Sequence, residues 1–351
     1  MYYEFIALLY VFIASLYTAG VKKIQVDSIH LFLITCIILF VVFSAIVYYK
    51  YKKNPEYFTK DPNPYNFKKN PFKNILTPIS WKIGAASSLN YILLLYTLKK
   101  LPLSFVVPIG LSWLVFALLF NKVLRNVEIT KEKIISLVIV ISGVILMQIH
   151  HIFGVSNLTK MNQKSMDSQY NFITLLFLLL LANIIKAYQV TEVKMAEEYA
   201  NYLDVIIMDW GQSLIYAIMF YLIYMFYPNK WWKTEIPKKN EVIKLILVVV
   251  VLQLTFVLLK FKAIENLDVE TFTLITTTSL IFAVILGYIL FNEKMEINKF
   301  LGALVIIGGI YYSNVSTKKI DQDRELNNES KVDSKPHLET HSKWGSGIPI
   351  H

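Results

Sequence analysis

Cysteine, arginine and charge are scarce in this sequence. Its 351 residues include one cysteine, Cys36, and two arginines, Arg125 and Arg324. A single thiol excludes an intrachain disulfide and a metal site built from cysteines. Charged residues make up 17% of the chain and hydrophobic residues 55%, whereas soluble domains average about 25% charged and about 45–50% apolar residues. The composition therefore indicates an integral membrane protein and not a soluble domain with a large core.

The motifs of several enzyme classes are also missing. There is no P-loop, so the chain itself is not expected to hydrolyse a nucleotide. An intramembrane aspartyl protease needs two carboxylates on facing helices, but Asp204 and Asp209 lie on one predicted helix and no Gly-x-Gly-Asp motif occurs. His150 and His151 end another predicted helix with no cysteine or carboxylate set around them. We therefore predict neither an enzyme nor a bound cofactor.

The net charge of +10 comes almost entirely from lysine. A basic protein can bind nucleic acid, but a basic chain made of apolar spans more often carries its lysines at the cytoplasmic membrane surface. We therefore expect membrane lipid, and not nucleic acid, as the partner of these charges.

Long apolar runs fill most of the chain. A membrane-spanning helix needs about 20 mainly apolar residues. This criterion predicts an all-α polytopic membrane protein with ten transmembrane helices, at 3–20, 30–50, 75–98, 102–123, 133–150, 171–190, 203–227, 241–264, 270–291 and 296–314. The first run lacks the basic start and the cleavage site of a signal peptide, so it is expected to remain as the first span.

The predicted helices divide into two groups of five. Residues 1–150 are the first predicted repeat, 151–170 a linker loop and 171–315 the second repeat. Residues 316–351 are polar and are predicted to be a disordered tail. The histidines of this tail lack the spacing of metal ligands; they are His337, His341 and His351.

The distribution of lysine and arginine among the loops predicts the orientation. The loops at 51–74 and 122–133 and the tail are basic, and in a ten-helix protein these three segments lie on one side of the membrane. A basic cluster at 228–240 opposes this bias. The balance places both termini in the cytoplasm. Of three glycosylation sequons, only the one at Asn157 then faces away from the cytoplasm.

The chain repeats itself after 166 residues. LKKLPLSFVVPIGLSWLVFALLFNKVLRN, at 98–126, lies over IENLDVETFTLITTTSLIFAVILGYILFN, at 264–292, without a gap. The register also pairs small residues, Ser136 with Gly302, Ser142 with Gly308 and Gly143 with Gly309. Because five helices per half is an odd number, the second half must be inserted upside down. Inverted repeats are the architecture of secondary transporters, whose sites lie near the midplane where the repeats meet.

The second half resembles the drug/metabolite transporter superfamily, and within it the EamA-like transporters. The resemblance rests on AIENLDVETFTLITTTSLIFAVILGYILFNEKMEINKFLGALVIIGGI, in which an Asn-Glu-Lys turn at 292–294 joins the ninth and tenth helices. Gly302 and the pair 308–309 stand where the family has its glycines. In the first half the turn glutamate is displaced to Glu128, and Ser136 replaces one glycine. The resemblance implies a ten-helix carrier that translocates a substrate. The substrates of the superfamily are too varied for the resemblance to name one.

Proline and glycine positions predict a hinge and a packing surface. Pro108 in the fourth helix loses a backbone hydrogen bond, a fault tolerated in a membrane only where a neighbouring helix or a cavity satisfies the freed carbonyl. We predict a hinge at Pro108 and Gly110. Other glycines are expected to let helices approach closely, with a homodimer contact as an open alternative; they are Gly143, Gly302, Gly308 and Gly309.

Two opposite charges lie inside predicted helices. An ionisable side chain in hydrocarbon faces a cavity or a partner by default. Lys186 lies about one turn inside the cytoplasmic end of helix six and Asp209 less than two turns inside that of helix seven, so we expect an ion pair. The functional interpretations are a charge that binds substrate and a carboxylate that couples transport to protons. The alternatives are a structural pair and a lysine that reaches the membrane surface.

Other polar residues mark one face of helices three, six, seven, eight and nine, as a central aqueous cavity requires. Trp113 is interpreted either as a wall of this cavity or as a residue that faces lipid, and threonines can bond to their own helix backbone. The candidate substrate-binding residues are Ser87, Asn90, Tyr91, Trp113, Asn183, Lys186, Asp209, Gln212, Gln253, Thr276 and Thr277.

These patterns predict a secondary transporter of a small organic metabolite that works by alternating access. Phosphorylated solutes would favour paired basic residues deep in the cavity, and Lys82, Lys186 and Lys260 are the inward candidates. A nucleotide-sugar antiporter is therefore an alternative. The alternatives of another class are a membrane scaffold or channel and an intramembrane enzyme, although no selectivity-filter sequence stands out.

Overall fold

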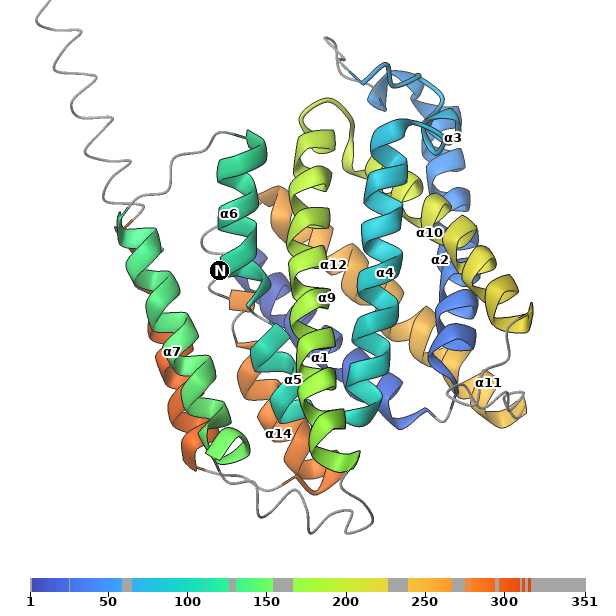
Figure 1. Ribbon diagram of the computed structural model, residues 1–351. Helices are drawn as coiled ribbons and strands as arrows, with labels where there is room; N and C mark the ends of the chain where they lie inside the picture. The colour runs from blue at the N-terminus through green and yellow to red at the C-terminus, as the bar shows by residue number, and fades with distance from the viewer. Residues whose placement is uncertain are drawn as a thin grey trace, which may run out of the picture.

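The computed structural model describes residues 2–24, 26–58, 65–110, 112–125, 131–153, 167–226, 239–266, 275–276, 278–293, 297–309, 311–312 and 315–316. These residues form helices joined by short turns, and no β-strand occurs among them (Figure 1). Asn157, Thr277 and nearly all of the predicted tail lie outside the described residues.

The first half of the chain consists of α1 (Tyr2–Lys23), α2 (Ser28–Lys53), η1 (Pro55–Tyr57), α3 (Pro71–Asn74), α4 (Pro78–Lys100), α5 (Leu103–Gly110), α6 (Trp113–Arg125) and α7 (Lys131–Phe153). Proline begins η1, α3 and α4, at the position where its missing N–H costs no helical hydrogen bond. At the start of α3 the side chain of Asn70 accepts a hydrogen bond from the backbone N–H of Phe72.

The second half consists of α9 (Asp167–Glu197), α10 (Tyr202–Phe226), α11 (Lys239–Leu247), the π-helical segment η2 (Val248–Gln253), α12 (Leu254–Asn266), α14 (Ser279–Phe291) and a last helix at Ile297–Gly309. Since α11, η2 and α12 follow one another without a break, they form one long rod. Asn292 ends α14 in the left-handed conformation, with φ of 51°, which asparagine tolerates better than most residues.

Each of the ten predicted spans contains a described helix, with differences in the fourth, sixth and ninth spans. The fourth span, 102–123, is two helices, α5 and α6, and not one. The sixth, predicted to end at 190, continues in α9 to Glu197 because TEVKMAE contains no helix breaker. The first residues of the ninth span, 270–274, lie outside the described residues.

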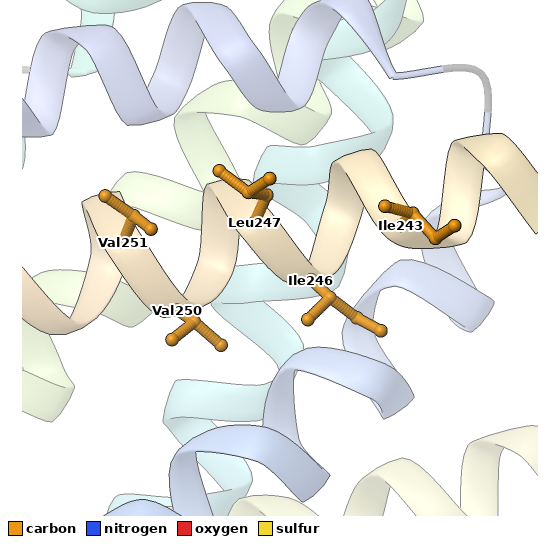
Figure 2. Close-up of a pocket in the computed structure, with 5 residues that line it drawn as sticks. All are labelled: Ile243, Ile246, Leu247, Val250 and Val251. Atoms are coloured by element: carbon orange, nitrogen blue, oxygen red, sulfur yellow. The ribbon is translucent and has the colours of Figure 1, made fainter.

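Length and composition allow several helices to cross a bilayer. The helices long and apolar enough are Tyr2–Lys23, Ser28–Lys53, Ile173–Glu197, Tyr202–Phe226 and Lys239–Lys260, and shorter apolar helices occur at Ile134–Gly143, Ser279–Phe291 and Ile297–Gly309. Their outer surfaces are apolar, as the groove on α11 and η2 shows (Figure 2); it is lined by Ile243, Ile246, Leu247, Val250 and Val251. Exposed apolar surface on this scale marks contact with a membrane. The chain is an integral, multi-pass membrane protein.

The helices of the two halves meet in one buried core. Its largest cluster takes residues from α1, α2, α4, α5, α9, α10 and α12. Phe32, Leu39 and Phe43 give α2 a fully buried face, whereas Ile37 and Val41 on its other face are exposed. The core therefore joins both repeats and does not divide between them.

At one edge of the bundle α7 packs against the last helix (Figure 1). Ser136 Oγ donates a hydrogen bond to the Gly309 carbonyl oxygen at 2.6 Å, and a Cβ on Gly143 would lie 2.9 Å from the Gly302 carbonyl oxygen. In the sequence register Ser136 aligns with Gly302 and Gly143 with Gly309, so each residue contacts the counterpart of the other. A two-fold axis produces this exchange of partners. The fold is an all-α bundle of two inverted five-helix repeats.

Two adjacent glycines of the last helix differ in their surroundings. A Cβ on Gly309 would lie 2.9 Å from Cγ2 of Ile139 in α7, so this residue belongs to the helix contact. Gly308, predicted to pack as well, is exposed, and among the described residues no atom beyond its own stretch of helix lies within 4 Å of the place of a Cβ. Close approach of the two helices therefore requires glycine at 309 but not at 308.

Candidate functional site

The two repeats carry the same interruption in their fourth helix. Between α5 and α6, the N–H of Ser112 donates to the Ile109 carbonyl oxygen at 2.9 Å. Before α14, the N–H of Thr278 donates to the Ile275 carbonyl oxygen at 3.0 Å. Adding 166 to the first pair of numbers gives the second, so both turns fall at one position of the repeat. Secondary transporters form their sites at discontinuous helices of this kind.

The interruption does not depend on proline. Pro108 precedes the first break within α5, but Leu274 stands at its aligned position in the second repeat. Gly110 is the last residue of α5, and among the described residues no atom beyond its own stretch of helix lies within 4 Å of the place of a Cβ. The hinge at Pro108 and Gly110 stays a prediction. The turn at Ser112, which has its equivalent in the second repeat, lies next to it in the chain.

Side chains supply the hydrogen bonds that each break leaves open. Asn183 of α9 is buried and donates from Nδ2 to the Ile109 carbonyl oxygen at 2.9 Å. In the second repeat the hydroxyl of Thr278 donates to the Ile275 carbonyl oxygen at 2.6 Å. At the first break a neighbouring helix thus supplies the additional bond, as expected for a fault inside a membrane. The amide of Asn183, a predicted substrate ligand, is engaged with the protein backbone.

Helix α9, which packs between α4 and α6 (Figure 1), brings Lys186 beside the first break. Its Nζ lies 4.9 Å from the ring centre of Trp113, the first residue of α6. Lys186 stands next to the middle of the span Ile173–Glu197, and a lysine is too short to reach water across half a hydrocarbon core, about 15 Å. In the described part of the chain no carboxylate pairs with it, and Lys260 of α12 repels it. A cation at this depth marks a binding or transport site by default.

Asp209 of α10 lies at the centre of a second polar group. Its Oδ2 accepts a hydrogen bond from Gln189 Nε2 at 3.4 Å, and the same amide lies 3.2 Å from Ser87 Oγ. Ser213 and Lys260 lie near enough to interact with the carboxylate. Asp209 Oδ1 and Ser213 Oγ are both inaccessible to water, and the hydroxyls of Ser87 and Ser213 lie close enough to interact with the carboxylate. The carboxylate is therefore surrounded by polar side chains of the protein.

A third polar group lies where α1, α2, α4 and η2 meet. The hydroxyls of Tyr17 and Tyr91 are hydrogen-bonded to each other, and Thr35 and Gln253 lie beside Tyr91. Gln253 ends the π-helical segment, a distortion frequent at functional sites. The buried Cys36 lies within electrostatic range of these tyrosines and of Asp209, so the second and third groups are neighbours in the core.

Three further candidate residues do not belong to these polar groups. Gln212 is fully buried and donates from Nε2 to the Ile75 carbonyl oxygen, and α4 passes so close that a Cβ on Gly84 would overlap Gln212. Asn90 and Thr276 are half-buried, and their role as substrate ligands stays a prediction. Gln212 therefore joins helices and does not belong to the polar groups around Asp209.

Two expectations about charged residues are wrong. Lys186 and Asp209 do not form the predicted ion pair, because α9 extends to Glu197 and places Gln189, one turn nearer the hairpin, beside Asp209. Lys82, predicted to point inward, is 59% exposed and lies 3.9 Å from the Glu192 carboxylate. The inward lysines near the centre are Lys186 and Lys260.

Comparison with known proteins decides the family. The model of the EamA-like transporter family matches residues 1–149 and 173–315, most of the chain. The chain belongs to the EamA-like transporter family. A crystal structure of another protein, 12% identical, superposes with a TM-score of 0.57 over 91% of this chain and 97% of that one, a likeness of fold alone. No curated protein matches the sequence significantly.

The turn that follows α14 closes one end of this EamA-like transporter. Glu293 Oε1 lies 3.1 Å from Lys22 Nζ and accepts a hydrogen bond from the N–H of Leu103 at 2.6 Å. Lys22 also donates to the Leu101 carbonyl oxygen at 2.8 Å. The carboxylate therefore caps α5 of the first repeat from a turn of the second. In the predicted orientation this end faces away from the cytoplasm.

The opposite end of the EamA-like transporter is held by different contacts. Arg125, at the end of α6, donates to the Glu198 carboxylate at 2.7 Å. Asn74 donates to both carboxylate oxygens of Asp204 at 3.1 Å. These pairs tie the first repeat to the α9–α10 hairpin. Each end of the bundle thus has its own polar closure between the repeats.

Several site residues escaped the sequence-based prediction, for identifiable reasons. Gln189 and Tyr17 lie in helices whose polar residues looked like isolated exceptions in apolar runs. A signal existed for Tyr17, since 17 and Asn183 differ by the repeat length of 166. Applying the register to the whole chain, and not only to residues 98–147, would have aligned Tyr17 with Asn183.

Proposed function

We propose that this protein is a secondary transporter of small organic metabolites that works by alternating access. The observation that carries the proposal is the pair of equivalent helix breaks, the first with Lys186 beside it at mid-span and bonded to Asn183 of the other repeat. Inverted repeats have two related conformations, one open to each side. Rocking of the repeats about the breaks would expose the central polar groups to the two sides in turn.

Two polar closures support this mechanism. The Lys22–Glu293 pair joins the repeats at one end, and the Arg125–Glu198 pair lies at the other. A carrier must open one end while the other stays closed, so the two pairs would break alternately. Coupling to protons would use Asp209, the carboxylate within the central groups.

A phosphorylated solute is the second candidate. Its support is the proximity of Lys186 and Lys260, two basic residues within range of one another. The Asp209 carboxylate near Lys260 opposes this candidate, because a phosphate dianion would meet a like charge there. We therefore place nucleotide sugars and similar solutes second.

Transport would be tested in two steps with the purified full chain. A panel of amines, amino acids, sugars and nucleotide sugars is first screened for thermal stabilisation; a ligand at 100 times its Kd stabilises by about 2.7 kcal/mol. Each hit is then loaded into proteoliposomes without ATP, and uptake of the labelled compound against the unlabelled one is measured. A carrier shows saturable counterflow. Linear flux without counterflow would indicate a channel, and no flux of any hit would reject transport in favour of a scaffold or an enzyme.

A further inference from the structure

Lysines gather at the end of the bundle where α2 and α3 meet (Figure 1). Within residues 48–58 and 65–77 six lysines occur together with one carboxylate, Glu56. Lys69 Nζ lies 3.1 Å from Glu56 Oε1, so the two segments lie side by side. All six lysines are exposed and together form what we call the lysine surface: Lys50, Lys52, Lys53, Lys68, Lys69 and Lys73. This surface has a large positive charge.

The segments that carry the lysine surface are anchored to the bundle. Phe58 and Phe67 are buried beneath it, each in a cluster of core residues. Asn74, also buried, donates to both carboxylate oxygens of Asp204 in α10 and accepts from the N–H of Lys68 at 2.6 Å. The backbone that carries the lysines is therefore already ordered, which lowers the entropic cost of binding an anion.

The length of α2 places the lysine surface at the level of lipid headgroups. A run of 20 helical residues covers about 30 Å, the thickness of the hydrocarbon core. Since α2 begins at Ser28, it leaves the hydrocarbon near Tyr48 and Tyr49, which are 59% and 69% exposed. Trp81, in the first turn of α4, is exposed at the same end. Exposed tyrosine and tryptophan mark the membrane interface, so the lysines that follow Tyr49 lie among the headgroups.

The opposite end of the bundle also has lysines, but carboxylates accompany them. Lys22 contacts Glu293, Lys244 contacts Glu241, and Lys99 lies within electrostatic range of Asp27. A surface of nearly balanced charge attracts an anionic membrane weakly. The two ends therefore differ in net charge, and the lysine surface is the one suited to anionic partners.

We propose that the lysine surface binds anionic phospholipids through their phosphate groups. Lysine binds phosphate as a point charge, and the neighbouring Tyr48, Tyr49 and Leu76 offer exposed apolar surface to the acyl chains. A soluble anion would leave that apolar surface unused, so a lipid fits better. In the predicted orientation this end faces the cytoplasm, whose leaflet carries the anionic lipids.

The first test compares lipids that differ in headgroup alone. The purified full chain in dodecyl maltoside is titrated with dioctanoyl phosphatidylglycerol, dioctanoyl phosphatidylcholine or glycerol phosphate, and thermal stabilisation is measured. We expect phosphatidylglycerol to act at a concentration at least about tenfold below the other two, since each lysine near anionic lipid contributes about fivefold in affinity. Equal potency of the two lipids would overturn the proposal. Equal potency of glycerol phosphate would also overturn it, in favour of a site for soluble anions.

A set of variants then locates the binding surface. Lys50 and Lys68 stay in place because the first contacts the Tyr57 ring and the second bonds to Asn74. The other lysines of the surface are neutralised together, as Lys52→Gln, Lys53→Gln, Lys69→Gln and Lys73→Gln. This combined variant should bind phosphatidylglycerol at least about tenfold more weakly than the unmodified protein. If it does not fold, the pairs 52 with 53 and 69 with 73 are tested separately, and each should weaken binding.

The matched control removes the same charge from exposed lysines of the opposite end. It combines Lys23→Gln, Lys100→Gln, Lys239→Gln and Lys244→Gln. Its affinity for phosphatidylglycerol should stay within about twofold, well below the tenfold change of 1.4 kcal/mol. An equal loss in both variants would show a diffuse attraction to net charge and overturn the proposed surface. Since lipid binding is measured without a substrate, its outcome is independent of transport.

Discussion

Ser136 donates a hydrogen bond to the carbonyl oxygen of Gly309, although 173 residues separate them in the chain. The contact joins the last helices of the two repeats, and its symmetric counterpart is the approach of Gly143 to Gly302. Because both contacts follow from one register, the seam between α7 and the last helix is where the inverted repeat can be tested most directly by substitution.

Enlarging Gly143 should destabilise the protein. In Gly143→Leu the new side chain would meet Ile306, whose Cγ1 lies 2.6 Å from the place of the Cβ. Overpacking of this kind costs about 1–3 kcal/mol, so the melting temperature in detergent should fall. The matched control is Gly308→Leu on the last helix, at an exposed position that faces away from α7. This variant should melt like the unmodified protein. Equal effects of the two variants would contradict the close contact.

The Lys22–Glu293 pair should show strong coupling. Both side chains are largely buried, 13% and 12% exposed, so removal of one leaves the other poorly solvated. A double-mutant cycle with Lys22→Met and Glu293→Gln should give a coupling energy of about 1–3 kcal/mol in thermal stability. The comparison pair, Lys69 and Glu56, is 66% and 76% exposed and should give about 0–1 kcal/mol. Similar coupling in both cycles would argue against a buried closure.

Replacement of Asn183 should affect stability and not ligand affinity. Asn183→Leu removes the side-chain donor to the Ile109 carbonyl oxygen, which keeps its hydrogen bond from the Ser112 N–H. The loss of one hydrogen bond costs about 0.5–1.5 kcal/mol. The melting temperature should therefore fall, while the Kd of a ligand found in the screen stays within about twofold, below the tenfold change of 1.4 kcal/mol. A large rise in Kd at unchanged stability would instead make Asn183 a substrate ligand, as the sequence-based prediction has it.

Cysteine labelling should establish the orientation. In a Cys36→Ser background, Lys23→Cys and Lys52→Cys place single exposed thiols near opposite ends of α2. With both termini in the cytoplasm, a membrane-impermeant maleimide should label Cys at 52 from the cytoplasmic side and Cys at 23 from the other. The reverse pattern would invert the orientation without changing the fold.

Features with a periodic or repeated signal could be predicted from the sequence. The repeat register aligned Gly143 with Gly309, and apolar runs located α2 and α10 to within a few residues. The same runs misplaced the end of α9, because an apolar criterion stops at the membrane surface whereas a helix continues until a breaker occurs. That single boundary error led to the incorrect prediction of an ion pair between Lys186 and Asp209.

Side-chain partners could not be predicted where the backbone is the partner. Asn183 and Gln212 have the composition expected of a substrate site, yet they donate to the carbonyls of Ile109 and Ile75. Which carbonyls need a donor depends on where helices break and where loops enter the bundle. Neither is visible in a hydropathy pattern. Lys82 was misassigned for a related reason, since the face that α4 turns outward is set by its contacts with α9 and α10.

The single cysteine of this chain gives the site a built-in chemical reporter. Cys36 is fully buried and lies within electrostatic range of Asp209 and of the Tyr17–Tyr91 pair, so a small thiol reagent can reach it only when the helices around it separate. Its rate of modification should therefore rise in a conformation that opens the bundle. With no other thiol to remove, the natural protein can be followed through its transport cycle without any substitution.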